Sequence, residues 1–162
     1  MNKLVILFFL FITNVYGFIA DSKKPINVIA KEVFIDQKNG FSTYTGDVVV
    51  KQGSVILKAA TIRIYHPNKH PKNMVAIGSE KKPAYYYQVN KKKEIIAKAL
   101  RMDYKIKNQF LKLEGNAKLR QGNDTFDGHI LFYDIKLDKV KAKGKSKTKD
   151  GKKGRIKFTI QL

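Results

Sequence analysis

Apolar residues recur at every second position along most of this chain. The alternation begins in residues 26–30, continues at Val33 and Ile35, and resumes after the turn-forming sequence at residues 38–40. A period of two is typical of β-strands that bury one face, because successive side chains of a strand point to opposite sides. The pattern therefore predicts a series of short strands, with Val33 and Ile35 on a buried face.

One stretch of this pattern occurs twice. Residues 41–64 recur sixty-nine positions later as residues 110–133, without a gap. Identical residues pair as Phe41 with Phe110, Gly46 with Gly115, Gln52 with Gln121, and Gly53 with Gly122. Glycine tolerates bends, bulges and positive φ, so glycines at matching offsets predict the same backbone shape in both copies. The parity of the alternation changes at Gly53, which predicts a turn or bulge there.

The remaining segments fit the same scheme. Residues 66–73 hold two prolines and no apolar residue, and they read as a loop. Residues 97–102 are read as strand, and residues 137–144, with Leu137 on the apolar side, as a degraded last repeat. The Lys-rich residues 145–154 predict a flexible loop, and the alternation in residues 155–162 predicts a final strand.

Many short strands without an amphipathic helix indicate an all-β sandwich, barrel or solenoid. Repeats of roughly thirty residues favour stacked rungs, each burying its apolar face against its neighbours. If the rungs fold into a narrow V or an open roll, one inner row is continuous. That row is Ile26, Val28, Val48, Val50, Leu57, Ile62, Ile64, Tyr86, Ile106, Leu111, Leu113, Leu119, Phe126 and Leu131.

Such a row is an ordinary hydrophobic core by default. Small residues interrupt it, and the chain has no Trp to fill its centre. A thinly filled row could accept acyl chains, since each buried methylene contributes about 0.8 kcal/mol.

The first residues resemble a cleaved signal peptide. Lys3 precedes an uninterrupted apolar run at residues 4–12, which is about half of the roughly 18 residues that a membrane-spanning helix needs. Small residues before Phe18 predict cleavage after Gly17, giving a single mature domain of residues 18–162 in the periplasm. The alternative is an uncleaved membrane anchor.

The formal charge of +20, from 33 Lys and Arg against 13 Asp and Glu, favours an acidic partner. Anionic lipid headgroups, a phosphorylated glycolipid and nucleic acid all meet this requirement. Residues 85–87, three tyrosines, could stack on bases, but the signal peptide argues against nucleic acid. Because the chain has no Cys, disulfides and thiol chemistry are excluded.

No catalytic or cofactor motif is present in the sequence. The glycines lie within strands, without a following helix to receive a phosphate. His66 and His70 have a spacing found in metal sites, but the prolines around them and the lack of a third ligand favour a solvated loop. We therefore expect no enzyme activity, no cofactor and no metal.

The order of several motifs resembles one known family. The motifs are Pro25 with Ile26-x-Val28-x-Ala30, Thr45-Gly46-Asp47-Val48-x-Val50-x-Gln52-Gly53, Leu57-x-Ala59, Pro83-Ala84 with Tyr86-Tyr87-Gln88, Ala99-x-x-Met102-x-Tyr104, Leu113-x-Gly115-Asn116-Ala117-x-Leu119 and Gly154-Arg155-Ile156. Together they are similar to the OstA-like domain of the LptA family of periplasmic lipopolysaccharide-transport proteins, over almost all of residues 18–162.

This resemblance implies a non-enzymatic carrier with a twisted antiparallel β-jellyroll, open at both ends. Lipid A acyl chains would occupy the groove, with Ile26, Tyr86 and Ile106 facing lipid. Copies would stack head to tail in a bridge between the inner and outer membranes. The N-terminal edge, Ile26, Val28 and Ala30, would meet LptC, and the C-terminal edge, Ile156, Phe158 and Ile160, would meet LptD or another copy.

Two other functions remain open from the sequence. An inner-membrane-anchored, LptC-like OstA-domain component would keep its first seventeen residues. A secreted basic protein that binds nucleic acid or another polyanion would use the charge alone.

Overall fold

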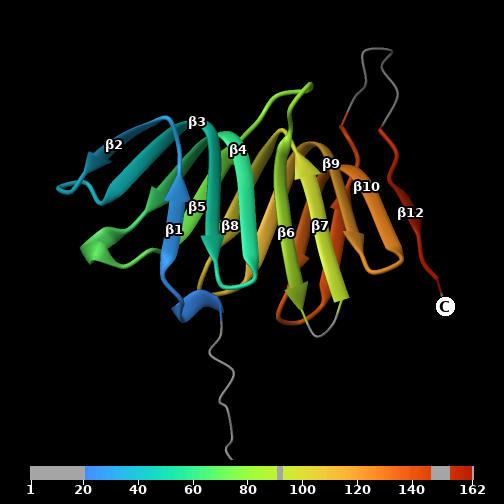
Figure 1. Cartoon of the computed structure of the whole chain (residues 1–162). Coiled ribbons are helices and arrows are strands. Elements are labelled where there is room, and N and C mark those ends of the chain that lie inside the picture. Colours follow the sequence, from blue (N-terminus) through green and yellow to red (C-terminus); the bar gives the residue numbers. More distant parts are fainter. Residues whose placement is uncertain (1–20, 91–92, 147–153, 162) are drawn as a thin grey trace, which may run out of the picture.

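The alternating pattern becomes an antiparallel sheet in the computed structural model of the chain, which describes residues 21–90, 93–146 and 154–161 (Figure 1). Its strands are β1 (Ile26–Ile29), β2 (Glu32–Asp36), β3 (Phe41–Gln52), β4 (Val55–Tyr65), β5 (Asn73–Ile77), β6 (Ala84–Asn90), β7 (Lys93–Ala99), β8 (Arg101–Lys105), β9 (Phe110–Gln121), β10 (Asp124–Asp134), β11 (Lys139–Lys143) and β12 (Lys157–Thr159). Two short 3₁₀ turns, η1 (Asp21–Lys23) and η2 (Pro67–Lys69), complete the described elements. The predicted all-β class is confirmed.

The sheet is folded into two layers, because the four long strands β3, β4, β9 and β10 each belong to both. The halves next to the β3–β4 and β9–β10 turns pair with β1, β6, β7 and β12, and we call this layer arm A. The other halves pair with β2, β5, β8 and β11, and we call this layer arm B. In Figure 1, β1, β6 and β7 of arm A lie in front of β5 and β8 of arm B.

A bulge in each long hairpin marks the fold between the arms. Gly46 and Asp47 have φ of +83° and +49° and together face the single residue Ala60 across the β3–β4 ladder. Such a bulge bends the strand and increases its twist. A Cβ at Gly46 would lie 2.7 Å from the Lys31 side chain. Both the positive φ and the lack of space therefore favour glycine at this position.

The second copy repeats this geometry. Gly115 and Asn116 have φ of +80° and +48°, and they face one residue of β10. The two-residue turns that follow also match, with Gly53 at +59° and Gly122 at +57°. The predicted repeat is therefore confirmed as a repeated backbone, with bulge and turn at the same offsets in both hairpins.

Three apolar residues that the sequence placed on a buried face are exposed. Val33 and Ile35 on β2 are 55% and 51% exposed, because β2 is an edge strand with no neighbour on its outer side among the described strands. Leu137 is 58% exposed in the turn before β11. Alternation assigned these side chains a direction, but no opposing layer covers them.

The end of the chain also differs from the prediction. The final strand is only Lys157–Thr159, and Ile156 and Ile160 flank it rather than extend it. The Lys-rich loop lies mostly outside the described residues, although Gly154 N–H donates to the Lys145 carbonyl at 2.8 Å where the flanking segments meet. The expected signal peptide, residues 1–17, also lies outside the described residues.

Candidate functional site: the interior between the arms

The sheet register joins the predicted inner residues into continuous rows. In arm A, one row crosses eight strands as direct cross-strand neighbours. Its members are Val28, Val50, Leu57, Tyr86, Ala97, Leu119, Phe126 and Phe158. Because every member lies directly opposite the next, the row runs perpendicular to the strands from one end of the roll to the other.

Arm B presents a matching pair of rows to the same interior. The first is Val33, Tyr44, Ile62, Ala76, Met102, Leu113, Leu131 and Ala142. The second is Ile35, Ser42, Ile64, Met74, Tyr104, Leu111, Tyr133 and Val140. The two arms therefore enclose one apolar layer, as expected for two faces that share a core.

The centre of this interior is filled. The predicted inner residues Val48, Val50, Leu57, Ile62, Ile64, Tyr86, Ile106, Leu111, Leu113, Leu119 and Leu131 belong to one core cluster and are at most 4% exposed. The expectation of a thinly filled channel is therefore wrong for the centre, where these side chains are almost completely buried. Buried alanines such as Ala76 and Ala97 let the arms approach closely instead of leaving space.

Both ends of the interior are looser than the centre. Ile26, Val28 and Phe126, the other predicted inner residues, are only partly buried against the core. At the β1–β2 end, a cavity of about 420 Å³ opens between the arms beside Ile26, Tyr44 and other residues.

Apart from Ile77 and Val89, the exposed large apolar side chains of the described residues lie at these two ends. They are Ile29, Val33, Phe34 and Ile35 at one end, and Leu137, Ile156, Phe158 and Ile160 at the other. Exposed apolar residues grouped in this way are typical of contact surfaces.

A buried polar group closes the interior near the β3–β4 turn, and the sequence analysis missed it. Asp21 of η1 is 6% exposed and accepts hydrogen bonds from Ser54 N–H at 2.9 Å and Gln88 Nε2 at 3.1 Å. Burial opposes ionisation of this carboxyl, but the hydrogen bonds from Ser54 and Gln88 outweigh burial and lower its pKa. Asp21 thus ties the segment before β1 to the β3–β4 turn and to β6.

The same network continues to the central tyrosines. Tyr86 Oη donates to Gln88 Oε1 at 2.8 Å, and the Tyr86 and Tyr104 rings lie 5.5 Å apart across the two arms. Burial raises the pKa of Tyr104 to about 12 and that of Tyr86 well above its ordinary value, so both phenols stay neutral. The interior therefore carries hydroxyl groups without charge.

His66 makes an ordinary polar contact. His66 Nε2 lies 2.7 Å from Ser42 Oγ at the β1–β2 end. Within the described part of the chain, no three His, Cys, Asp or Glu side chains are grouped as metal ligands would be. Neither of the described helical turns has the length and hydrophobicity needed to cross a bilayer.

Comparison with known proteins identifies sequence relatives of this chain. A family model described as LptA/(LptD N-terminal domain) LPS transport protein matches residues 27–139. The lipopolysaccharide export system protein LptA of Haemophilus influenzae is 29% identical over 130 residues, covering 80% of this chain and 76% of that protein. The lipopolysaccharide export system protein LptH of Pseudomonas aeruginosa is 35% identical over 127 residues, covering 76% and 70%.

A solved structure has the same fold. The crystal structure of LptH from Pseudomonas aeruginosa, described as the LptA-homologous periplasmic component of the lipopolysaccharide transport device, superposes with a TM-score of 0.76. It is 32% identical, and the match covers 88% of this chain and 99% of that structure. The likeness therefore extends over nearly the whole of the solved chain.

Proposed function

Because the chain belongs to the family of lipopolysaccharide transport proteins that comprises LptA and the N-terminal domain of LptD, we propose that it carries lipopolysaccharide through the periplasm from the inner to the outer membrane. The lipid A acyl chains lie between arm A and arm B. The protein acts as a carrier and not as a catalyst. Its mature form, residues 18–162, follows from cleavage of the signal peptide after Gly17.

The observation that carries this proposal is the continuity of the apolar rows. The arm A row passes through Leu57, Tyr86 and Leu119 and reaches both ends of the roll. An acyl chain moving along it meets apolar surface at every strand, and each methylene that leaves water contributes about 0.8 kcal/mol. A row without a charged interruption supports movement along the roll as well as binding within it.

Entry of acyl chains requires the arms to separate, since the central side chains are buried against each other. Interiors packed to this degree do not admit a ligand without moving apart. The V shape allows this, because continuous strands join the arms only through the bulges at Gly46 and Gly115. At the outer ends the described arms are tied by side-chain contacts, such as Gln121 with Asp138 and Asn90 Nδ2 with the Ile135 carbonyl at 3.2 Å, and these must break when the arms separate. Apolar contacts between the arms are then exchanged for contacts with lipid.

The end strands β1 and β12 determine how copies of the chain join. Tyr86 of β6 lies opposite Leu57, and Phe158 of β12 lies opposite Phe126, which is the repeat equivalent of Leu57. Strand β12 is therefore the second copy of β6. In the same way β7 is the second copy of β1, since Ala97 lies opposite Leu119 as Val28 lies opposite Val50.

Inside the molecule, β6 and β7 pair with each other, whereas the outer edges of β12 and β1 have no partner among the described strands. Copies therefore join end to end, with β12 of one copy against β1 of the next in the register of β6 with β7. This places Phe158 opposite Val28 of the next copy, by strand addition to an open edge. The apolar row of arm A continues across the junction.

Arm B gives an independent check on this register. Strands β5 and β8 pair inside the molecule, and their repeat equivalents are β11 and β2. Transferring the register brings Lys139 opposite Asp36 of the next copy and Lys143 opposite Glu32. Opposite charges directly across a sheet stabilise the pairing, by about 0.2–1 kcal/mol each.

The same register also covers exposed apolar residues. Ala142 lies opposite Val33 of the next copy, and Val140 lies opposite Ile35. Within one molecule Val33 and Ile35 are about half exposed. At the two termini of such a bridge, the free β1–β2 edge would meet LptC and the free β11–β12 edge would meet LptD.

Site-specific photo-crosslinking in membranes tests the carrier function. A photoreactive aromatic residue at Tyr86, inside arm A, is expected to label lipopolysaccharide. The matched control is Tyr65, an aromatic residue on the outer face of arm B, which is expected to give little label. Labelling of nucleic acid from both positions, without lipopolysaccharide from Tyr86, would instead support the polyanion-binding alternative.

A further inference from the structure

The outer face of arm A carries a row of cations that the proposed function does not use. Directly behind the apolar row, the register aligns another set of cross-strand neighbours. They are Val49, Lys58, Tyr85, Lys98, Lys118, Asp127 and Lys157. Neighbouring strands lie about 4.8 Å apart, so the ammonium groups of Lys58, Lys98 and Lys118 belong to one compact surface.

The one carboxylate of this row, Asp127, lies beyond Lys118, between Lys118 and Lys157. The middle of the row is electrostatically unfavourable without a further anion. Lys98 of β7 lies directly opposite Lys118 of β9, and like charges in directly opposite positions destabilise a sheet. Among the described residues, no carboxylate forms an ion pair with Lys58, Lys98 or Lys118.

The outer face of arm B is different. There Arg101 pairs with Asp103 at 3.2 Å and Lys112 pairs with Glu114 at 2.8 Å. On that part of arm B each cation thus lies beside a carboxylate, whereas on arm A Lys98 and Lys118 lie opposite each other.

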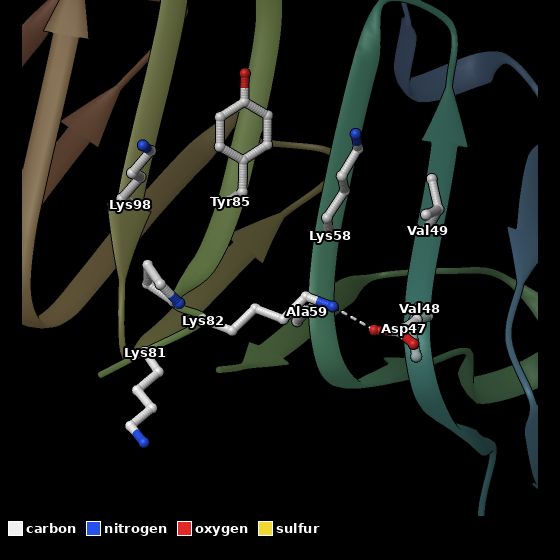
Figure 2. Close-up of a pocket in the computed structure, with 10 residues that line it drawn as sticks. Asp47, Val48, Val49, Lys58, Ala59, Lys81, Lys82, Tyr85 and Lys98 are labelled. Atoms are coloured by element: carbon white, nitrogen blue, oxygen red, sulfur yellow. Dashed lines mark hydrogen bonds and ion pairs between the residues drawn. The ribbon is translucent and has the colours of Figure 1, made fainter. Parts of the chain in front are cut away.

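A cavity of about 470 Å³ lies over this row (Figure 2). Lys58, Tyr85 and Lys98 stand side by side on three neighbouring strands and form one wall, with Lys58 Nζ 5.8 Å from the centre of the Tyr85 ring. Lys81 and Lys82, which precede β6, border the cavity. The volume far exceeds the roughly 30 Å³ that one water molecule occupies in the liquid, so the cavity has room for a sugar as well as an anionic group.

The one carboxylate that lines the cavity is already neutralised. Asp47, in the β3 bulge, forms ion pairs with Lys82 and with Lys31 at 3.2 Å. Figure 2 shows the Lys82 side chain reaching toward Asp47, which leaves the ammonium groups of Lys58 and Lys98 available on the wall. The cavity therefore keeps an excess of positive charge around an aromatic ring.

We propose that this outer cavity binds a phosphorylated sugar, with the phosphate between Lys58 and Lys98 and the sugar against Tyr85. Lysine is a compact cation suited to phosphate, and an aromatic ring offers a flat apolar surface with a hydroxyl for the sugar. The choice of a phosphosugar as ligand class rests on the proposed function, because lipopolysaccharide is a phosphorylated glycolipid. The site itself is separate from the interior, on the opposite side of the same sheet.

The test is a titration of the mature chain with glucosamine 1-phosphate, followed by the amide NMR shifts of β4, β6 and β7. We expect saturable shifts at Lys58, Tyr85 and Lys98, and none with glucosamine. The double variant K58Q/K98Q is expected to weaken binding by about tenfold or more. The matched control K105Q/K107Q removes the same charge from the arm B side and is expected to change affinity less than about twofold.

Three outcomes would overturn the inference. Equal loss in K58Q/K98Q and K105Q/K107Q would show that only overall charge matters. Inorganic phosphate binding as tightly as glucosamine 1-phosphate would assign the site to free phosphate. Shifts confined to residues of the interior would place the sugar elsewhere. Photo-crosslinking of lipopolysaccharide from Tyr86 in the K58Q/K98Q background separates this inference from the carrier function, because it persists if only the outer site is lost.

Discussion

Tyr86 and Phe158 occupy equivalent positions in the two halves of the roll, yet Tyr86 is 0% exposed and Phe158 is 65% exposed. One structural difference is the edge beside each residue. Strand β7 pairs along β6 and covers the edge beside Tyr86, whereas no described strand pairs along the outer edge of β12. The pairing of β6 with β7 is thus a junction inside the molecule. The equivalent junction at the other end contains only β12, and the strand that would complete it is the equivalent of β7, namely β1 of another copy.

A designed disulfide tests the register of the end-to-end junction. The chain has no cysteine, so no native thiol competes with a pair introduced as V33C and A142C. Cβ atoms of directly opposite residues lie about 4.5–5.5 Å apart, close to the spacing that a disulfide requires. We expect covalent chains of two or more copies under oxidising conditions on a denaturing gel.

The control pair is V33C with K141C. A shift of one residue turns the side chain to the other face of the strand, so this pair is expected to cross-link poorly. Equal cross-linking by both pairs would contradict the register and leave only a general tendency of the ends to meet.

Replacement of Phe158 by Asp is expected to weaken association of copies by at least about tenfold, because a charge replaces an apolar contact at the centre of the junction. Substitutions at exposed positions usually change stability by less than about 0.5 kcal/mol, so the melting temperature should stay within about 2 °C. Sedimentation velocity measures the association. The control I77D also replaces an exposed apolar residue, but at mid-molecule, and should associate like the parent; a similar loss in I77D would argue against the end contact.

The bulge at Gly115 is expected to be more sensitive to substitution than the turn at Gly122. Both glycines have positive φ, which costs an L-residue about 1–2 kcal/mol. A Cβ at Gly115 would also lie 2.9 Å from the Leu100 side chain, whereas nothing lies within 4 Å of one at Gly122. Urea unfolding should show a loss of more than about 2 kcal/mol for G115A and about 1 kcal/mol for G122A. Equal losses would mean that Leu100 moves aside freely.

Asp21 makes stability depend on pH in the acid range. Its pKa is lowered in the folded state, so the carboxylate contributes stability at neutral pH, and this is lost as pH falls below the unfolded value of about 3.9. We expect D21N to be less stable than the parent by about 1–3 kcal/mol at pH 7, since hydrogen bonds to a charged group are removed. Urea unfolding at pH 7 and pH 3 should show this gap narrowing in acid. D127N, on the outer face, controls for the charge change, and a gap that is unchanged at pH 3 would show that ionisation of Asp21 is not involved.

Much of the fold could be predicted from the sequence because its determinants are local and repeated. The matching glycines at Gly46 and Gly115 locate the bulges, and alternation identifies residues such as Leu57 and Leu113 as inward-facing. These features depend only on backbone geometry and on the period of a strand.

Other features depend on what lies opposite a residue, which alternation does not encode. Val33 and Ile35 alternate correctly but are exposed, because β2 is an edge. The filled centre depends on the distance between the arms, which the buried alanines shorten. Asp21 precedes the first strand and has no periodic signal, so its hydrogen bonds to Ser54 and Gln88 emerge only from the folded chain.

The central claim is that the arms separate to admit acyl chains. Spin labels at Lys51, near the end of arm A, and at Lys107, in the turn beyond β8 in arm B, report the distance between the arms by pulsed electron paramagnetic resonance. The label–label distance is predicted to lengthen when lipopolysaccharide is added and to stay the same with glucosamine 1-phosphate. An unchanged distance in samples where Tyr86 cross-links to lipopolysaccharide would contradict the opening of the interior.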